Sequence, residues 1–433
     1  MAKIFPFPAL RYDPAKVPLA KVVTQPYDKI TPEMQANYYA KSPYNLVRVI
    51  LGKQEPGDSE TNNVYTRAAA NFQAWRAQEI LTPDHAPSIY LYTQSFKVPG
   101  DNSGTILERR GFIALGQIED YDRKVVFRHE QTLSKPKADR LNLLRATCSH
   151  FGQIFMLYSD PAGQVDGTLR QPGPPTVEVR DEYGVIHRMW KVSDPEAIAR
   201  VQTLMADKKL IIADGHHRYE TALKFRDEQR KGGTGDPDKP YERVMMTFVN
   251  MDSPGLVVLP THRVVFGVEN FDAADMVRKL EKYFEASHIG PSSTIESVLR
   301  ELRDSGTERT ALLAIASTGG FLLRARPGQQ SPVLSELSER QRSLDVVQLH
   351  KLVLEETLGM SEEDIRNQTH LKYLRDFRDA LNEVRQGANV AFIMNPVRMD
   401  QVREVAFAGE VLPQKSTDFY PKLLTGLTIY SLE

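Results

Sequence analysis

The sequence predicts an α+β protein with a mixed-sheet body and a smaller, mainly helical region toward its C-terminus. Segments that alternate like strands are interspersed with segments of helical spacing along the 433 residues. Hydrophobic residues make up 41% of the chain and charged residues 26%, as is typical of globular proteins. From about residue 270 the sequence becomes richer in charged, helix-like segments.

The N-terminal part contains both kinds of element. Apolar residues at helical spacing predict helices over 31–42, 62–79, 137–147, 195–206 and 215–230. Thr31 and Pro32 add a helix start signal to the first of these. Alternating or short apolar runs predict strands over 44–51, 88–98, 109–118, 154–158, 176–179, 187–192, 209–213 and 244–250.

The C-terminal part is expected to be mostly helical. Helices are predicted over 272–284, 294–303 and most of 338–386, with a hairpin at 312–316 and 320–324 and a strand at 389–394. We therefore divide the chain into an α+β body (1–268), an appended and largely helical region (269–388), and a segment that returns to the body (389–433).

Composition excludes several classes of protein. The single cysteine, Cys148, cannot form an intrachain disulfide, which argues against a secreted disulfide scaffold. Pro6 and Pro8 interrupt the N-terminus where a signal peptide needs an apolar core, and no apolar run approaches the length of a membrane span. We expect a cytoplasmic protein without membrane contact. The net charge of −1 makes nucleic acid an unlikely partner.

The most informative segment runs from an apolar strand directly into a helix. Asp214 is placed to cap the helix, and Gly215 permits a tight turn. His216, His217 and Arg218 follow in the first helical turn, where unpaired N–H groups carry partial positive charge. Neighbouring helical residues point about 100° apart, so we expect one histidine and the arginine to face a ligand. The junction predicts an anion site, most naturally for phosphate.

A second segment, 123–145, is rich in cations. It holds seven Lys and Arg residues but only two acids. Lys135, Lys137 and Arg140 lie in or next to a predicted loop and are candidates for binding a polyphosphate. Glu130 is a candidate base or magnesium ligand, and Thr132 is a candidate substrate-binding residue.

Three further segments carry weaker signals. Asp28 stands in a constrained Pro-Tyr-Asp turn and is a second candidate base. Thr261, His262 and Arg263 close an apolar run, and such strand-end loops often carry binding residues. The polar and aromatic segment 413–422 is a candidate lid or clamp. Walker, kinase and nucleophile-elbow signatures are missing from the sequence.

Taken together, these segments resemble one prokaryotic family. The segments are Ala9–Tyr12, Pro26–Asp28, Ser42–Asn45, His129–Arg140, Ala213–Ala222, Pro260–Arg263 and Pro413–Thr417. Their order over nearly the whole chain resembles the family catalogued as domain of unknown function 1015. The block from Asp214 to Arg218 is also similar to that of free serine kinases of the ParB/sulfiredoxin superfamily.

This second resemblance implies a ParB/sulfiredoxin-like nucleotide-binding core. Asp214, His216, His217 and Arg218 would then bind nucleotide phosphates, with Asp214 as a magnesium ligand. The implied activity is phosphoryl transfer from ATP or ADP to a small hydroxyl-bearing metabolite such as free L-serine, with Asp28 or Glu130 as the base. His216 would assist the transfer, and residues 261–263 would bind the acceptor.

Two alternatives to a kinase remain at this point. A ParB-like regulator would bind nucleotide without synthetic activity, and a plain scaffold would bind none. The donor, the acceptor and the choice of base are open, and so is the oligomeric state, for which a homodimer is one alternative.

Overall fold

The computed structural model divides the chain into two compact units. It describes residues 2–433 apart from 102, 131–133, 172, 233–235, 291 and 329–330, and for residues 134–136 it describes only the backbone. Unit 1 comprises Met1–Arg128, Thr132–Val257 and Pro421–Glu433, and unit 2 comprises His129–Gln131 and Val258–Tyr420. The domain boundaries expected at 268/269 and 388/389 differ from these divisions and stay a prediction.

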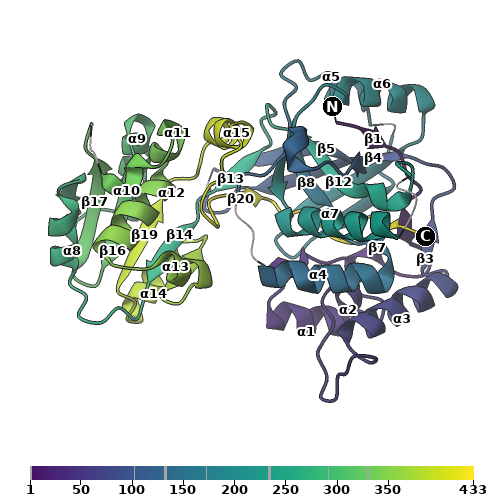
Figure 1. Cartoon of the computed structure of the whole chain (residues 1–433), viewed down its shortest axis with the longest axis horizontal. Coiled ribbons are helices and arrows are strands. Elements are labelled where there is room, and N and C mark those ends of the chain that lie inside the picture. Colours follow the sequence, from purple (N-terminus) through teal and green to yellow (C-terminus); the bar gives the residue numbers. More distant parts are fainter. Residues whose placement is uncertain are drawn as a thin grey trace. The chain divides into compact units, whose positions relative to one another are not determined.

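A large mixed sheet forms the centre of unit 1 (Figure 1). Its described strands follow the order β6 (Val126–Phe127), β11 (Leu210–Asp214), β8 (Ile154–Tyr158), β12 (Arg243–Asn250), β5 (Ile106–Gln117), β4 (Ile89–Lys97), β10 (Ile186–Val192) and β9 (Val177–Arg180), and β1 (Ile4–Phe5) pairs with β5. The β6–β11 and β8–β12 pairs are parallel, whereas the other pairs of this sheet are antiparallel. The predicted mixed-sheet body is thus confirmed.

Helices pack against this sheet and against one another. Helix α6 (Pro195–Met205) contributes Ile198 and Val201 to the core of the sheet, and α7 (His216–Lys231) contributes Tyr219 and Ala222. Helix α4 (Ser134–Thr147) packs on α7, and α3 (Val64–Ala77) packs on α4. Figure 1 shows these helices as successive layers, with α1 (Pro32–Lys41) and α2 (Val47–Ile50) beside α3. Short α5 spans Gln164–Thr168.

The segment 44–51 was predicted as a strand, and that prediction is wrong. The β-branched run around Val47 forms the short helix α2. The side chain of Asn45 explains the difference, because its Oδ1 accepts a hydrogen bond from the backbone N–H of Val47 at 3.0 Å, while its amide nitrogen donates to the carbonyl of Lys21 at 2.8 Å. A local cap therefore overrides the strand preference of the run.

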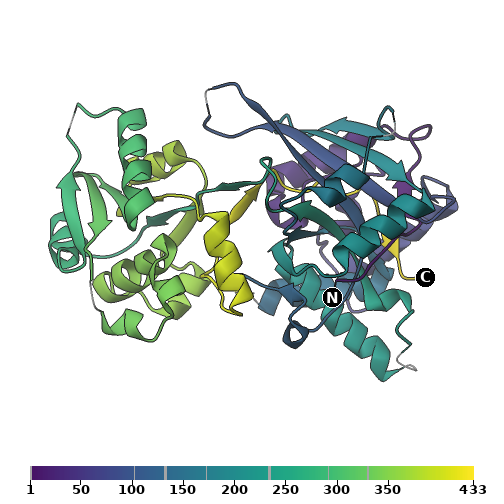
Figure 2. The ribbon, with the colours of Figure 1, turned by 90° about the horizontal axis from the view of Figure 1, so that it is seen from above.

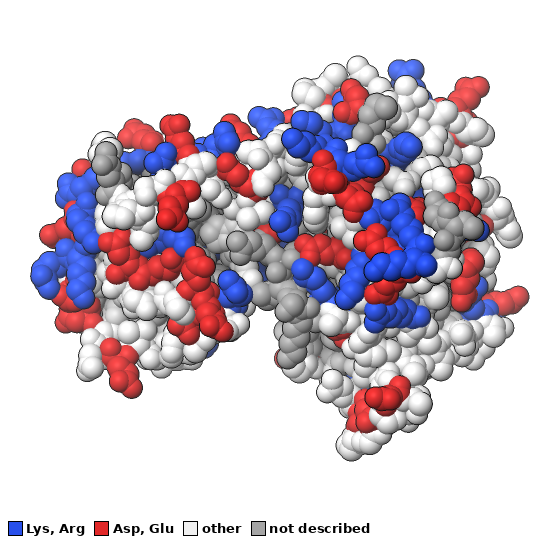
Figure 3. Space-filling view, in the orientation of Figure 1, with Lys and Arg blue, Asp and Glu red and all other residues white. Residues whose placement is uncertain are grey.

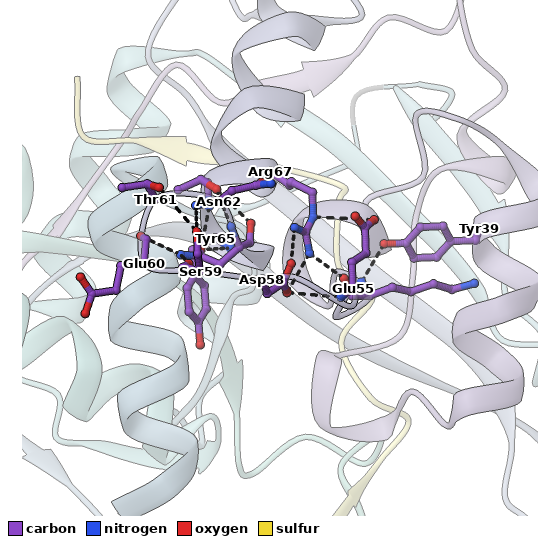
Figure 4. A network of polar contacts seen from close by, with 12 residues as sticks. Tyr39, Glu55, Asp58, Ser59, Glu60, Thr61, Asn62, Tyr65 and Arg67 are labelled. Carbon is purple, nitrogen blue, oxygen red and sulfur yellow. Dashed lines mark hydrogen bonds and ion pairs between the residues drawn. The ribbon is translucent and has the colours of Figure 1, made fainter.

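The loop that precedes α3 is held by polar contacts (Figure 4). The Arg67 guanidinium pairs with the Asp58 carboxylate at 2.6 Å and donates to the carbonyl of Lys53 at 3.0 Å. Asn63 caps the helix, and its backbone N–H donates to the Thr66 hydroxyl at 2.9 Å. This reciprocal capping box fixes where α3 begins.

Short strands join distant parts of unit 1. Strand β2 (Leu10–Tyr12) pairs with β3 (Leu81–Pro83), and β7 (Ser149–His150) pairs with β21 (Tyr430–Ser431). Figure 2 shows the C-terminal segment, in yellow, running into this unit. The last 13 residues are therefore part of the unit 1 fold.

Unit 2 is built on an antiparallel sheet of six described strands. Their order is β15 (Phe284–His288), β17 (Gly319–Ala325), β16 (Ala311–Ala316), β19 (Val390–Met394), β14 (His262–Val265) and β18 (Leu371–Leu374). Strands β13 (Val257–Leu259) and β20 (Asp418–Tyr420) form a separate pair. The predicted hairpin and the strand near 390 are present, but β14, β15 and β18 were not predicted, so the description "mainly helical" misses the central sheet.

The helices of unit 2 surround this sheet in sequence. They are α8 (Ala273–Leu280), α9 (Ile295–Glu308), α10 (Pro332–Ser335), α11 (Glu339–Arg342), α12 (Asp345–Gln348), the π-helix η5 (Leu349–Thr357), α13 (Glu362–Asn367), α14 (Phe377–Arg385) and α15 (Met399–Phe407). Buried Val264, Leu313, Ile393 and Ala380 join the sheet to these helices in one hydrophobic cluster. None of the helices in the described part of the chain has the length and apolar character needed to cross a membrane.

Candidate functional site

The junction between β11 and α7 forms as the sequence predicts, with one correction. Gly215, not Asp214, is the N-cap of α7, and its φ of 93° lies in the left-handed region that favours glycine. A β-bulge between Ile212 and Asp214 shifts the strand register just before the turn. Asp214 therefore does not cap the helix, and its carboxylate points to other partners.

Two cations bind the Asp214 carboxylate. Lys422 Nζ lies 3.0 Å from Oδ2, and a guanidinium nitrogen of Arg218 lies 3.8 Å from Oδ1. Burial alone would raise the pKa of Asp214, but the charges of Lys422, Arg218 and Lys29 outweigh it and hold the pKa well below its usual range. Asp214 is therefore ionised and already neutralised by the protein.

This pairing bears on the expected magnesium ligand. Within the residues that the structure describes, no group of three or more His, Cys, Asp or Glu side chains lies together as a metal site. Asp214 is also bonded to two cations, which compete with a metal for its oxygens. The residues present do not make a protein-held metal site, so magnesium ligation by Asp214 stays a prediction that this geometry does not favour.

Arg218 covers the glycine turn. Its guanidinium donates to the backbone carbonyl of Gln153 and lies so close to the turn that a Cβ at Gly215 would come within 3.0 Å of it. A Cβ at Gly152 would meet the same guanidinium at 3.0 Å. The two glycines thus leave space for this arginine between α7 and the start of β8. His216 is buried and His217 is half-buried, so His216 is the inward-facing histidine.

A small cavity lies beside Arg218, with a volume of about 60 Å³. Arg140 of α4 and Arg218 of α7 both line it. The hydroxyls of Ser149 and Thr221 also belong to its lining, and neither has a hydrogen-bond partner among the described residues. Both residues are more than nine-tenths buried. Two cations and two unsatisfied hydroxyls therefore converge on one enclosed space.

The turn that contains Asp28 lies at the same place. The Arg140 guanidinium stacks on the Tyr27 ring at 4.0 Å, and Tyr27 lines the cavity. The charge of Arg218 acts on Tyr27, and that of Lys29 acts on Asp214. Asp28, in the same 3-10 turn (η2, Tyr27–Lys29), is exposed. The structure thus brings the Pro-Tyr-Asp turn to the β11–α7 junction.

The cations of the 123–145 segment are largely engaged by protein groups. Lys137 forms an ion pair with Glu220 of α7, and Arg128 lies 4.0 Å from the same carboxylate. Arg140 pairs with Asp139 and donates to the carbonyl of Ile50 at 2.8 Å. On the face drawn in Figure 3, Lys and Arg are intermixed with Asp and Glu where α4 and α7 lie. The segment 134–137 is helical, not a loop as expected.

Two of the expected residues are not fully described. Thr132 lies outside the described residues, and for Lys135 only the backbone position within α4 is described. Their roles in binding substrate or phosphate stay predictions.

Glu130 belongs to unit 2. Its Oε1 accepts hydrogen bonds from the backbone N–H of Thr417 at 2.9 Å and from the Thr417 hydroxyl at 3.1 Å. His129 Nε2 lies 2.7 Å from the same hydroxyl. Glu130 therefore binds the segment 413–417, which the sequence singled out as a lid or clamp.

Residues 261–263 also belong to unit 2, and they are not an exposed loop. His262 and Arg263 lie in β14 and are buried, with 3% and 1% exposure. The backbone N–H of Met394 donates to His262 Nδ1 at 3.2 Å, while Arg263 donates to the carbonyls of Thr261 and Lys415. Burial, helped by the Arg263 charge, lowers the pKa of His262 to about 4. These contacts are structural in kind, and acceptor binding by the three residues stays a prediction.

Sequence reasoning missed some groups of this site. Lys422 stands 208 positions from its partner Asp214, and only its place in the polar segment 413–422 drew attention to it. Arg109 was not singled out, although it is 1% exposed and donates to the Gln94 side chain and to the carbonyl of Pro421 at 2.5 Å. Gln94 also donates to the carbonyl of Lys422 at 2.8 Å. These two residues position the Lys422 segment.

The chain belongs to the family described as protein of unknown function DUF1015, whose profile matches residues 4–347. No match was found among curated proteins. Among solved structures, the chain is similar to a mutant free serine kinase in complex with ADP (13% identity, TM-score 0.37, 76% of this chain and 98% of that chain). It is also similar to C-terminally truncated SbnI from Staphylococcus aureus (10%, 0.37, 73% and 87%). A conserved hypothetical protein from Pyrococcus furiosus is a third (13%, 0.32, 68% and 87%). At these values, no activity or residue role is transferred from them to this chain.

Proposed function

We propose that this protein is a phosphotransferase, a nucleotide-dependent kinase that acts on a small hydroxyl-bearing metabolite such as free L-serine. The observation that carries the proposal is the cavity beside the N-terminus of α7, where Arg218, Arg140 and the hydroxyls of Ser149 and Thr221 converge. Buried hydroxyls without a partner are costly, and an anion that accepts from them removes that cost. The volume, about that of two water molecules, admits a phosphoryl group but not a whole nucleotide.

The same junction supplies the other requirements of phosphoryl transfer. Phosphoryl transfer needs positioning and charge neutralisation more than covalent help from the protein. Arg218 and the first turn of α7 would hold the transferred group, and Arg140 would neutralise it from α4. The similarity of the 214–218 block to free serine kinases supports this assignment, and a ParB/sulfiredoxin-like core is part of the same proposal. Magnesium and a homodimer belong to it as untested parts.

Asp28 is the better of the two candidate bases. Its turn lies at the β11–α7 junction and its carboxylate is exposed, whereas the Glu130 carboxylate is occupied by Thr417. In the proposed step the acceptor hydroxyl loses its proton to Asp28 and attacks the terminal phosphorus of ATP or ADP. The bond from phosphorus to the bridging oxygen breaks, and ADP or AMP leaves.

The test is a transfer assay on the full chain with ATP or ADP, magnesium and L-serine. Phosphoserine, detected by ³¹P NMR, is the expected product. Nucleotide binding without any product would instead identify the ParB-like regulator. No binding of either nucleotide in calorimetry would refute the proposal.

A pair of arginine variants locates the site. Arg218→Ala removes a charged hydrogen-bond donor from the cavity and is expected to weaken nucleotide binding by about 1.5–3 kcal/mol. Arg145→Ala is the matched control, because Arg145 pairs with Glu228 across the same two helices and does not line the cavity. Equal affinities of the two variants would remove Arg218 from the site.

A further inference from the structure

A second cavity lies within unit 2 and has no part in the proposed transfer. Its volume is about 250 Å³, and its walls come from α11, α12, the π-helix, α13 and the segment 411–414. Apolar side chains form much of the wall, among them Val347, Ile365 and Val411. Pro413 and Gln414 also line it, so the conspicuous 413–417 segment borders this cavity. The space is larger than a benzene-sized cavity of roughly 150 Å³.

The polar group that lines this cavity is His350. It lies at the second position of the π-helix and is 5% exposed, and its Nε2 has no hydrogen-bond partner among the described residues. A buried ring nitrogen without a partner costs free energy, and π-helical segments are frequent at functional sites. The unsatisfied nitrogen and the cavity beside it together point to a ligand that contacts this histidine.

The electrostatic surroundings define the charge of that ligand. Burial and the positive charges of Arg263 and Lys351 lower the pKa of His350 well below its usual range, so the ring is neutral and carries one N–H. Arg263 is fully buried and donates to two backbone carbonyls, while its Nε has no partner among the described residues. The field at His350 is therefore positive and favours an anionic group.

The far side of the cavity is neutral. Lys351 Nζ lies 2.9 Å from a carboxylate oxygen of Glu355 and 2.7 Å from one of Glu362, so these acids balance the lysine and the neighbouring Arg366. The lining thus offers a positive field at one end and apolar walls elsewhere. This combination suits a molecule with one anionic end and an apolar body.

We propose that the unit 2 cavity binds a small organic acid, whose carboxylate accepts a hydrogen bond from His350 and whose apolar body lies against Val347, Ile365 and Val411. The site is separate from the phosphate-binding cavity of unit 1, and its ligand is neither the nucleotide nor the hydroxyl acceptor. An acid bound there would contact Pro413 and Gln414 and so order the segment that binds Glu130.

Calorimetry on the full chain without nucleotide tests this proposal. The probes are hexanoate and benzoate, each compared with its uncharged amide of the same shape. We expect both acids to bind and both amides to bind at least about tenfold more weakly, because the amide lacks the negative charge. Equal affinities for acid and amide, or no binding of either acid, would overturn the proposal.

Two variants place the ligand in the cavity. His350→Leu removes the N–H, and we expect the acids to bind at least about tenfold more weakly. His288→Leu is the matched control, because His288 is exposed, packs on Phe321 and does not line the cavity. Val411→Phe fills the cavity from its partly exposed rim and is expected to abolish binding with the thermal unfolding curve preserved. Unchanged binding in Val411→Phe and His350→Leu would place the acid elsewhere.

A last comparison separates this site from the proposed kinase site. Arg218→Ala lies in unit 1 and is expected to leave the affinity for hexanoate unchanged while it weakens nucleotide binding. A protein that binds hexanoate but no nucleotide would uphold this inference and refute the proposed function. The reverse result would do the opposite.

Discussion

Both units bury an arginine that donates to backbone carbonyls, but the two arginines have different neighbours. In unit 1, Arg218 lies beside the Asp214 carboxylate and lines a cavity. In unit 2, Arg263 is held by the carbonyls of Thr261 and Lys415 and lines neither cavity. The difference teaches that polar residues after an apolar run become ligand-facing only where the backbone leaves the sheet, as it does at Gly215. In β14 the backbone stays in the sheet, and the side chains become structural.

The two candidate bases provide the sharpest test of this contrast. Asp28→Asn is expected to reduce the rate of phosphoryl transfer by about 100- to 10,000-fold, since it removes the proton acceptor. Glu130→Gln keeps a carbonyl oxygen for Thr417 and is expected to change the rate by less than about tenfold. Initial rates of phosphoserine formation at saturating substrates measure both. A larger loss in Glu130→Gln would move the base to unit 2.

The ion pair of Asp214 with Lys422 is expected to have the next largest effect, on stability. Lys422→Ala leaves a largely buried carboxylate with only its weaker partner, and we expect a loss of about 2–3 kcal/mol in the free energy of unfolding. Adding Asp214→Asn to this variant should restore part of the loss, which urea unfolding measures.

A unit 2 ion pair serves as the control. Arg375 pairs with Asp418 at 2.5 Å, but its side chain is 34% exposed, so Arg375→Ala should cost only about 1 kcal/mol. Equal losses in Lys422→Ala and Arg375→Ala would show that the two units do not differ in this respect.

Acid should destabilise both units through buried histidines. Burial lowers the pKa of His150 in unit 1, and burial with the Arg263 charge lowers that of His262 in unit 2, each to about 4. Because the unfolded chain binds a proton near pH 6.5 and the folded chain does not, stability falls as the pH drops from 6.5 toward 4. We expect each histidine to cost about 2 kcal/mol between pH 7 and pH 5.

Variants assign these losses to the units. His262→Asn can keep the acceptor for the Met394 N–H and should flatten the pH dependence of unit 2 only, whereas His150→Asn should flatten that of unit 1 only. Hydrogen exchange resolved by peptide measures the two units separately. A flattening of both by one variant would indicate that the units unfold together.

The smallest expected effect concerns the loop before α3. Arg67→Ala removes the ion pair with Asp58 and the bond to the Lys53 carbonyl. Because these groups are exposed, we expect faster amide exchange in residues 53–63 with the unfolding transition unchanged. Asn63→Ala, which removes the cap of α3, should instead also shift exchange within the helix.

Much of the fold follows from local signals. The strand expected at 154–158 is β8, and the helix expected at 215–230 is α7 displaced by one residue, because apolar periodicity and the Gly215 turn act locally. The hairpin at 312–324 is formed by β16 and β17 for the same reason. By contrast, β14 holds His262 and Arg263, which carry no strand signal of their own. Its pairing with β18 and β19, more than 100 residues later, fixes it.

The candidate site divides in the same way. The turn, the arginine and the inward histidine lie within five consecutive residues and were predicted as a group. The meeting of this group with Tyr27, Arg140 and Lys422 depends on tertiary packing, which one sequence does not encode as a local pattern. The roles of Asp28, Glu130 and residues 261–263 stay predictions.

The placement of residues 421–433 in unit 1 has a consequence for biosynthesis. Strand β21, which pairs with β7, and Lys422, which pairs with Asp214, are among the last parts of the chain to be translated. A nascent chain that has emerged only as far as residue 420 holds an uncompensated Asp214 and an unpaired β7. Unit 1 therefore completes its fold only after unit 2 has left the ribosome, although most of unit 1 is synthesised first.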